Sequence, residues 1–355
     1  MSKMYSFIGR WRTFVCSMGL LCTLLPLFAQ KHIRIMEYNV ENLFDTISST
    51  THADNDFTPQ GSYQWTSQRY WSKLSKISRV IAAAGEEQPI DLIALIEVEN
   101  DSVLSNLVHR TKLWRMEYDY VITHSPDVRG INVALIYQPH RFQLISKNAL
   151  RIAPPKQNAR STRDVLHVTG LLFTGDTLDV FVCHFPSRRG GRTAMLYRAD
   201  VAKALRNEVN LVMQQRRDAH IIIMGDFNAY YPEAIFTEHL KTELPPALPH
   251  SITANTLYLL SHQMRGRGDV AGTYKFQGVW NQLDHFIVND KLLYNNASLT
   301  NALHTRPQAC RIVDFPFLLQ TDKNSMGLHP YRSFLGNYYQ GGFSDHLPLI
   351  LDLYY

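Results

Sequence analysis

Ile221-Ile222-Ile223-Met224-Gly225-Asp226-Phe227-Asn228 is the stretch of sequence that decides the fold. Its first four residues would be apolar on both faces of an extended chain, which is typical of a strand covered on both sides. Other short runs rich in Ile and Val predict further strands. These runs span residues 33–40, 90–98, 131–137, 165–173, 178–185, 283–288 and 347–354.

Two segments have the spacing of amphipathic helices. In residues 67–84 the apolar side chains form one stripe, and Thr66 or Ser67 can cap the N-terminus. Residues 193–215 repeat the pattern. Strands alternating with helices, together with a hairpin turn at residues 174–176, predict an α/β fold with mixed sheets and helices outside.

The N-terminus predicts a signal peptide over residues 1–29 and a domain over residues 31–355. Lys3, Arg10 and Arg12 precede an apolar stretch at residues 14–28 that ends at Ala29. A retained membrane anchor is the alternative, although the stretch is short for a membrane span. We therefore expect a secreted or periplasmic monomer that has no stable membrane insertion once the leader is removed.

Composition limits the class of protein. The chain is 45% hydrophobic, which excludes extensive disorder, and its 4 Cys in 355 residues exclude a disulfide scaffold. The formal net charge is +5, and the leader carries three of the basic residues and no acidic one, which leaves about +2. Attraction to phosphate must then come from local clusters. A bridge between Cys183 and Cys310 is one option in an oxidising compartment.

Polar residues end or open most of the apolar runs. Ligands of open α/β sheets gather beyond strand ends, so we expect these residues to meet at one edge of the core. Crowded carboxylates repel one another, and a set of oxygen ligands favours Mg²⁺, with Mn²⁺ or Ca²⁺ as alternatives. Taken singly, each residue is more typical of a turn or cap, and it is their occurrence together that favours a site. The residues are Asn39, Glu41, Glu97, His184, Asp226, Asn228, Asp284, Asp345 and His346.

Two pairings within this set predict catalytic work. Asp226 and Asn228 lie two residues apart, so one can take a proton from water while the other orients that water or a phosphate oxygen. A carboxylate such as Asp284 on one imidazole nitrogen of His346 would favour the charged ring, whose other nitrogen then donates to an anion. A structural histidine is the alternative.

Arginines form a third group of candidate site residues. Arg188 and Arg189 lie in a glycine-containing loop that follows His184 and precedes a helix, and Arg129 precedes another apolar run. Arginines grip phosphate oxygens, and helix N-termini attract anions. A solvated basic loop is the alternative.

The motifs together resemble one family. They occur in order at residues 36–43, 95–100, 129–134, 184–191, 224–228, 282–285 and 343–348. The chain resembles the endonuclease/exonuclease/phosphatase superfamily, as a secreted bacterial-type member similar to deoxyribonuclease I and exonuclease III. The resemblance spans the mature chain and implies a four-layer α/β/β/α sandwich of two packed mixed sheets.

The resemblance also implies roles for the polar residues. It makes Glu97 the main metal ligand, with Asn39 and Glu41 beside it and Asp345 nearby. It implies that Asp226 activates or positions the attacking water, with Asn228 as its partner. It implies that His346, paired with Asp284, binds the phosphate, and that His184 also contacts it. The implied reaction is Mg²⁺-assisted in-line attack of water on a phosphodiester.

The substrate is less sharply indicated. DNA or RNA comes first, and phosphomonoesters, sugar phosphates and phospholipid head groups follow. Tyr274, Phe276 and Trp280 either stack on bases or pack internally. A non-catalytic secreted binding module is a rival of another class. The sequence lacks the Gly-x-Ser-x-Gly and His-Glu-x-x-His motifs of serine hydrolases and zinc proteases.

Three features depart from the resemblance or stand outside it. Glu41 takes the place of an Asp in some relatives, and Ala229 follows Asn228 where many members carry an acid. An insert at residues 45–65 contains Asp54-Asn55-Asp56, which is typical of a solvated loop or of a second cation site.

Overall fold

The computed structural model describes residues 32–154, 161–293 and 302–355. The predicted signal peptide lies outside these described residues. Within them, no helix is long and apolar enough to cross a membrane. Residues His32–Tyr355 form one compact unit.

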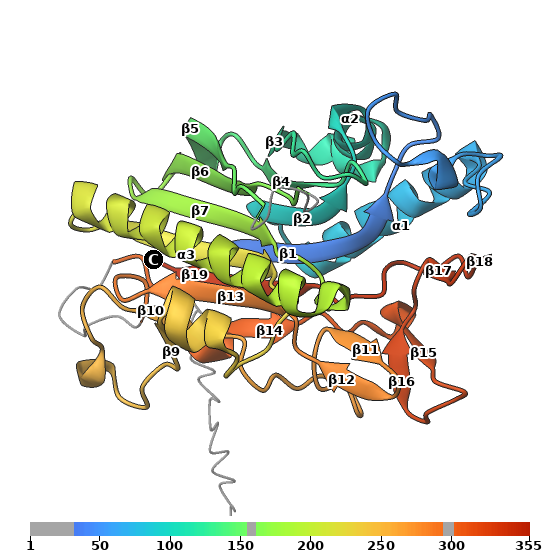
Figure 1. Cartoon of the computed structure of the whole chain (residues 1–355). Coiled ribbons are helices and arrows are strands. Elements are labelled where there is room, and N and C mark those ends of the chain that lie inside the picture. Colours follow the sequence, from blue (N-terminus) through green and yellow to red (C-terminus); the bar gives the residue numbers. More distant parts are fainter. Residues whose placement is uncertain (1–31, 155–160, 294–301) are drawn as a thin grey trace, which may run out of the picture. The chain divides into compact units, whose positions relative to one another are not determined.

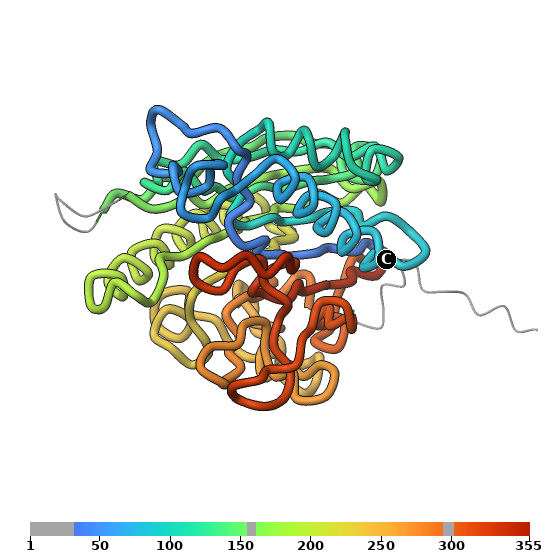
Figure 2. Tube along the Cα trace, turned by 90° about the vertical axis from the view of Figure 1, so that its right-hand side faces the viewer, coloured from blue at the N-terminus to red at the C-terminus, as the bar shows by residue number. Residues whose placement is uncertain are grey.

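A six-stranded mixed sheet holds both ends of this unit together. The strand that opens it, β1 (His32–Leu43), lies between the last strand, β19, and β2, antiparallel to the first and parallel to the second. Figure 2 shows the C-terminal end of the chain beside the first strand. The sheet order is β14 (Cys310–Ile312), β19 (Leu349–Tyr354), β1, β2 (Leu92–Val98), β4 (Asn132–Tyr137) and β3 (Asp119–Ile122).

A seven-stranded mixed sheet is built around the stretch that opened the sequence analysis. That stretch forms β8 (His220–Asp226), which runs parallel to β7 (Thr177–His184) and antiparallel to β13 (Asp284–Asn289). The sheet order is β5 (Phe142–Leu150), β6 (Val165–Leu172), β7, β8, β13, β10 (Leu257–Leu259) and β9 (Thr242–Glu243). The predicted turn at residues 174–176 joins β6 to β7, with Gly175 at φ +92°.

The two sheets pack face to face, with helices outside (Figure 1). Ile222 and Met224 of β8 belong to the core shared with the six-stranded sheet, whereas Ile221 and Ile223 pack with residues of α3 (Gly191–Gln215). This alternation follows from the two-residue period of a strand. Helices α1 (Ser67–Gly85) and α2 (Asp101–Arg110) accompany the other sheet. The predicted four-layer sandwich is confirmed.

Helix caps explain one prediction and one omission. The Thr66 side chain accepts a hydrogen bond from the Arg69 amide, so the cap predicted for α1 is confirmed. Helix α2 was not predicted, although Asn100 caps it by accepting from the Val103 amide at 3.0 Å. An Asn before a short run with apolar residues three and four apart was the available signal.

Short elements complete the fold. Three two-stranded ribbons are β11 (Tyr274–Phe276) with β12 (Val279–Asn281), β15 (Leu319–Thr321) with β16 (Leu328–Pro330), and β17 (Phe334–Leu335) with β18 (Tyr338–Tyr339). The helical turns are η1 (Asn55–Phe57), η2 (Lys112–Met116), η3 (Arg188–Gly190), η4 (Ile235–Leu240), η5 (Pro249–Ser251), η6 (Pro307–Ala309) and η7 (Pro316–Leu318).

The cysteine bridge considered from the sequence does not form. Cys183 and Cys310 are both free and buried. Cys183 packs with α3 on the outer side of the seven-stranded sheet, whereas Cys310 belongs to the core of the six-stranded sheet. The fold therefore relies on packing and on buried polar contacts.

A buried ion pair supports the first strand. Asp352 of β19 accepts from Arg34 Nε at 2.8 Å and from Arg311 Nη1 at 2.9 Å. Burial opposes ionisation of Asp352, but the hydrogen bonds from both arginines lower its pKa below the ordinary value. A carboxylate with a lowered pKa stabilises the fold above its unfolded pKa of about 3.9, and this contribution disappears as the pH falls through the folded pKa.

Asp352→Asn should lower the free energy of unfolding by about 2 kcal/mol at pH 7, because it leaves the buried Arg34 with only the exposed Glu86 as its counter-charge. The difference from wild type should shrink below about pH 4, where the wild-type carboxyl is increasingly protonated. Urea denaturation followed by circular dichroism at pH 7, 5 and 3 measures both effects. Asp218→Asn, at an exposed ion pair with Lys291, is the control and should change little. An equal loss at pH 7 and pH 3 would contradict the assignment.

Candidate active site

The predicted residues of the seven-stranded sheet meet because of strand register. Asp226 ends β8, and it pairs with Asp284 at the start of the antiparallel neighbour β13. His184 ends β7 and pairs with Asp226 from the parallel side. Three residues far apart in the sequence thus share one edge of the sheet, as the strand-end argument predicted.

Asp226 is held by amides from both sheets. Its Oδ2 accepts from Asn39 Nδ2 of β1 and from Asn228 Nδ2, both at 3.2 Å, while its Oδ1 accepts from the Asn228 amide at 2.8 Å. Burial and the nearby Asp284 raise the pKa of Asp226 to about 7. A carboxyl with such a pKa can accept a proton near neutral pH.

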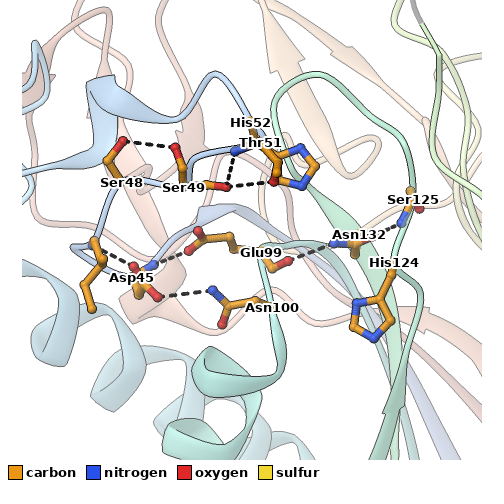
Figure 3. Close-up of a pocket in the computed structure, with 11 residues that line it drawn as sticks. Asp45, Ser48, Ser49, Thr51, His52, Glu99, Asn100, His124, Ser125 and Asn132 are labelled. Atoms are coloured by element: carbon orange, nitrogen blue, oxygen red, sulfur yellow. Dashed lines mark hydrogen bonds between the residues drawn. The ribbon is translucent and has the colours of Figure 1, made fainter.

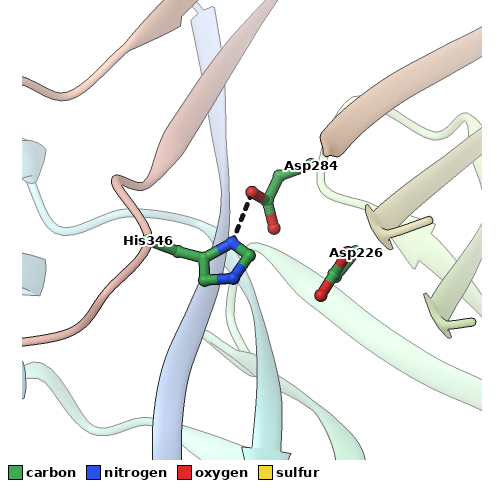
Figure 4. Close-up of side chains that lie close together, drawn as sticks. All are labelled: Asp226, Asp284 and His346. Carbon is green, nitrogen blue, oxygen red and sulfur yellow. Dashed lines mark hydrogen bonds and ion pairs between the residues drawn. The ribbon is translucent and has the colours of Figure 1, made fainter. Parts of the chain in front are cut away.

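Asp284 and His346 form a buried charge pair beside Asp226 (Figure 4). His346 Nδ1 lies 2.7 Å from Asp284 Oδ2, which also accepts from the Thr273 hydroxyl. Burial would lower the pKa of His346, but the charge and hydrogen bond of Asp284 raise it well above the usual value. The ring is therefore positively charged near neutral pH, and its Nε2 can donate to an anion.

His184 lies between two of the predicted carboxylates. Its Nε2 is 3.6 Å from Glu97 Oε1 and 3.7 Å from Asp226 Oδ2. Burial, together with the positive charges of Arg163 and Arg129, lowers its pKa well below the usual value, so the ring is neutral. Its Nδ1 has no hydrogen-bond partner within the described part of the chain.

Glu97 is the penultimate residue of β2, on the opposite sheet. Its Oε2 accepts from the Asn42 amide at 2.9 Å, which leaves Oε1 facing His184. Glu97 adopts φ +69°, and Glu41, Asn42 and Asn228 also have positive φ. Left-handed backbone at residues other than glycine is strained and clusters at functional sites. Four such residues at these strand ends support the location of the site.

Glu41, a predicted metal ligand, is held by backbone amides of a distant segment. Its Oε2 accepts from the Ser333 amide at 2.7 Å, its Oε1 accepts from the Phe334 amide at 3.1 Å, and Lys73 Nζ lies 4.0 Å away. Both oxygens are thus used to hold the segment at residues 333–334. The glutamate side chain is longer than an aspartate side chain by one methylene. Its carboxylate reaches these amides and does not contact Asp226.

Asp345 is partly exposed next to His346, and no hydrogen bond or ion pair among the described residues holds its carboxylate. One group of three potential metal-ligating side chains has ligand atoms within 4.8 Å of one another in the described chain, namely Asp226, Asp284 and His346. Glu97 and Asp345 are not members of it. Because His346 is already paired with Asp284, this group is better suited to anion binding than to holding a cation.

The three predicted phosphate-binding arginines are spread around the rim. Arg188 pairs with Glu233 at 2.5 Å and lies over the Tyr230 ring at 4.8 Å. Arg129 is half exposed, 4.0 Å from Asp127. Arg189 lies in η3, and its charge acts on Tyr274 and Tyr63. All three are available to a large ligand, but none touches the Asp284–His346 pair.

Two buried charged residues near the site were not predicted. Arg163 donates to the Phe185 carbonyl at 2.7 Å and pairs with Asp127 at 3.3 Å. Glu37 lies in β1, and neither of its carboxyl oxygens has a partner among the described residues. Burial and Asp284 raise the pKa of Glu37 well above the usual value. A Glu inside an otherwise apolar run was a usable signal, whereas Arg163 lies in no motif.

The insert at residues 45–65 forms a polar pocket of about 500 Å³ with the end of β2 (Figure 3). Glu99 accepts from the Asp45 amide at 2.6 Å, and Asn100 donates to Asp45 at 3.1 Å. Asp54 is buried and accepts from the Ser49 amide. Its oxygens therefore hold the loop together, which favours the loop interpretation over a second cation site.

Aromatic rings extend outward from His346. The Tyr274 ring lies 4.8 Å from His346, and Phe276 stacks on Tyr274 with centroids 6.5 Å apart. Phe276 is exposed, so the inner ring packs while the outer one is available to a ligand. Trp280, on the paired strand β12, donates to Asp269 at 3.4 Å.

Comparison with known proteins identifies the family. Residues 34–354 match the profile of the Endonuclease/Exonuclease/phosphatase family, which covers nearly all of the described chain. No curated protein sequence matches.

Solved structures of other proteins share the fold. Zebrafish (D. rerio) TDP2, complexed with a single-strand DNA product, is 13% identical with a TM-score of 0.53, covering 91% of this chain and 99% of that one. The human nocturnin catalytic domain with bound sulfate is 16% identical (TM-score 0.51, 91% and 94% covered). A Bacteroides thetaiotaomicron mannosyl-6-phosphatase is 14% identical (TM-score 0.53, 91% and 100% covered).

Proposed function

The chain belongs to the endonuclease/exonuclease/phosphatase family, and from this premise we propose that it is a divalent-metal-dependent phosphodiesterase. The observation that carries the proposal is the buried pair Asp284–His346 beside Asp226, whose pKa is about 7. A cationic donor and a proton acceptor at one strand edge suit hydrolysis of an anionic ester.

The residues around Glu97 fit a hard cation. Glu97 has one carboxylate oxygen that no amide occupies, and the Asp345 carboxylate has no partner among the described residues. The amide oxygen of Asn39 accepts from the Glu41 amide and keeps a second lone pair for a cation. Oxygen-only donors favour Mg²⁺ over softer metals. Bound by Glu97 with Asn39 and Asp345, such a cation would neutralise charge on the phosphate and on the leaving oxygen.

The remaining steps belong to side chains of this chain. Asp226 takes the proton of the attacking water, and Asn228 orients Asp226 through two hydrogen bonds. The charged His346 donates from Nε2 to a non-bridging phosphate oxygen, with Asp284 fixing the ring. His184 is placed between Glu97 and Asp226 to hold a second oxygen. These contacts strengthen as negative charge develops in the transition state.

DNA or RNA is the proposed substrate, and an exported monomer is the proposed form. Arg129, Arg188 and Arg189 at the rim can contact flanking phosphates, and a similarly folded TDP2 is known with a single-strand DNA product. The predicted leader supports export. A phosphatase of the same fold is the rival, since a mannosyl-6-phosphatase is also similar.

Metal removal tests the reaction class. The full chain, dialysed against EDTA, should lose cleavage of plasmid DNA, RNA and bis-p-nitrophenyl phosphate, and Mg²⁺ should restore it. Mn²⁺ and Ca²⁺ are assayed in parallel, with p-nitrophenyl phosphate, mannose 6-phosphate and sphingomyelin as competing substrates. Activity that survives EDTA would refute the metal-dependent mechanism. Absence of turnover on every ester would favour the binding module.

Glu97→Gln should raise the Mg²⁺ concentration needed for half-maximal activity by at least ~10-fold, because the amide removes the main anionic ligand. Titration of activity against Mg²⁺ measures this shift. Glu238→Gln, an exposed residue of η4, is the matched control and should leave the titration unchanged. An unchanged midpoint in Glu97→Gln would exclude this residue as the metal ligand.

A further inference from the structure

A second cavity lies beyond the end of β8, and no residue of the insert lines it. It has a volume of about 490 Å³, within the range of about 300–1,000 Å³ for small-molecule sites. Its lining is rich in aromatic residues, and we call it the aromatic pocket, defined by Tyr230, Tyr231, His262, Met264 and Trp280. The mechanism proposed above uses none of these five side chains.

Three links join the aromatic pocket to the catalytic residues. Tyr230 follows Asn228 by two residues, and Gln282, also in the lining, donates to the Asp284 carbonyl at 2.6 Å. Asn281 lines the pocket and pairs across the β11–β12 ribbon with Tyr274, whose ring packs on His346. Cross-strand partners have side chains on the same face, about 5 Å apart. A group bound beside Asn281 would therefore be close to the Tyr274 ring, which packs on His346.

The floor of the pocket is fixed and uncharged. His285 is fully buried, with Nε2 3.0 Å from the Ala229 carbonyl and Nδ1 2.8 Å from the Ser261 hydroxyl. Both nitrogens are satisfied when Nε2 donates and Nδ1 accepts, which is the neutral ring. Burial lowers the pKa of His285 to about 4, in agreement with this tautomer. The floor thus offers no charge to attract a phosphate, and both nitrogens of its imidazole are already hydrogen-bonded. The positive charge in the lining belongs to Arg265, which is exposed.

The walls favour a planar aromatic ligand. Tyr231 and His262 meet edge to face at 5.1 Å, and the Trp280 indole is anchored by Asp269 and faces the Lys275 ammonium at 5.8 Å. Rings held in place stack on other rings at low entropic cost. Gln263 and Asn281 at the margin add amide donors and acceptors of the kind that read base edges.

We propose that the aromatic pocket receives one nucleobase of the substrate, next to the phosphodiester that is cleaved. This inference rests on the proposed phosphodiesterase function and narrows its substrate to nucleic acid in which a base can leave the stack. Single strands and strand ends meet this condition without the cost of unpairing.

The test compares substrates that differ only in a base. Thymidylyl-thymidine is assayed against two analogues, each with an abasic tetrahydrofuran at one position. For the wild-type chain, loss of the base that enters the pocket should raise KM about 10-fold and change kcat little, as expected when one stacked base is lost. The other abasic analogue should behave like the parent.

Tyr231→Ala and Trp280→Ala should each raise KM for thymidylyl-thymidine by about 10-fold, and should have far less effect on the analogue that lacks the bound base. Trp280→Phe, which keeps a ring, should recover most of the loss. Trp114→Ala, at an exposed tryptophan of η2, is the control for tryptophan removal. Unfolding curves of all variants establish that each one folds.

The outcomes separate the two proposals. If the wild type cleaves bis-p-nitrophenyl phosphate but the variants affect base-bearing and abasic substrates equally, the pocket is structural and this inference is overturned. It is overturned as well if the variants impair mannose 6-phosphate hydrolysis instead. If no phosphodiester is cleaved, the proposed function fails. Calorimetric binding of thymidine 3′,5′-diphosphate to wild type and Trp280→Ala then decides the pocket alone.

Discussion

Asp226→Asn should lower kcat for bis-p-nitrophenyl phosphate by at least ~10²-fold, the scale typical of a missing general base. The substitution keeps the size of the side chain and the oxygen that accepts from the Asn228 amide, but it removes the carboxylate that takes a proton from water. Single-turnover rates at saturating Mg²⁺ measure the effect. Asp218→Asn, an exposed carboxylate on the surface, is the matched control.

The pH dependence of the wild-type rate is a second test of the role of Asp226. Asp226 must be ionised to act as a base, and burial with Asp284 raises its pKa to about 7 in the metal-free chain. Activity should therefore increase with pH along an acid limb, and a bound cation, being positive, should move that limb to lower pH. Asp226→Asn should lose the limb. A variant that keeps both its rate and its acid limb would remove Asp226 from the mechanism.

Asp284→Asn is expected to lower kcat/KM by ~10²-fold at pH 7.5, because it removes the charge that keeps His346 protonated. Without that charge the pKa of His346 should fall, because only Asp345 and Asp226 remain to oppose the effect of burial. The remaining activity should then fall off at a lower pH than in the wild type, since the donor loses its proton earlier as the pH rises.

Profiles of kcat/KM between pH 5 and 9 measure this shift. His346→Gln, which cannot become charged, should show the loss in rate without any displaced alkaline limb. Asp290→Asn removes a carboxyl from the far end of the same strand region and serves as the control. An alkaline limb in the same place for wild type and Asp284→Asn would contradict the charge-pair role.

The strand-end residues were predictable because a strand has a simple period and its end has a defined place in a sheet. Asp226 and His184 follow apolar runs, Asp284 opens one, and the register brings them together. Helix α2 was missed because it is short, and the apolar pattern of its ten residues is easily attributed to a loop. Ribbons such as β17–β18 have only two residues per strand and leave no periodic signal.

The finer geometry of the site was not predictable from type and spacing alone. Glu41 shares the motif of Asn39, yet its carboxylate is used by amides nearly three hundred residues along the chain, a long-range contact that no local pattern encodes. Arg163 and Glu37 are relevant because they are buried near the site, and their burial depends on how the two sheets pack. Sequence motifs identified the participants, while their orientation came from tertiary structure.

The hydrogen bond from Asn39 to Asp226 crosses from one sheet to the other. The position of the Asp226 carboxylate therefore depends on the distance between the two sheets. A methyl group added or removed in the interlayer, for instance at Met224 or Leu95, would shift the layers by a fraction of an ångström and detune the proton acceptor without touching it. On warming, fluctuations in the spacing of the two sheets should lower the rate of turnover at temperatures below the unfolding transition.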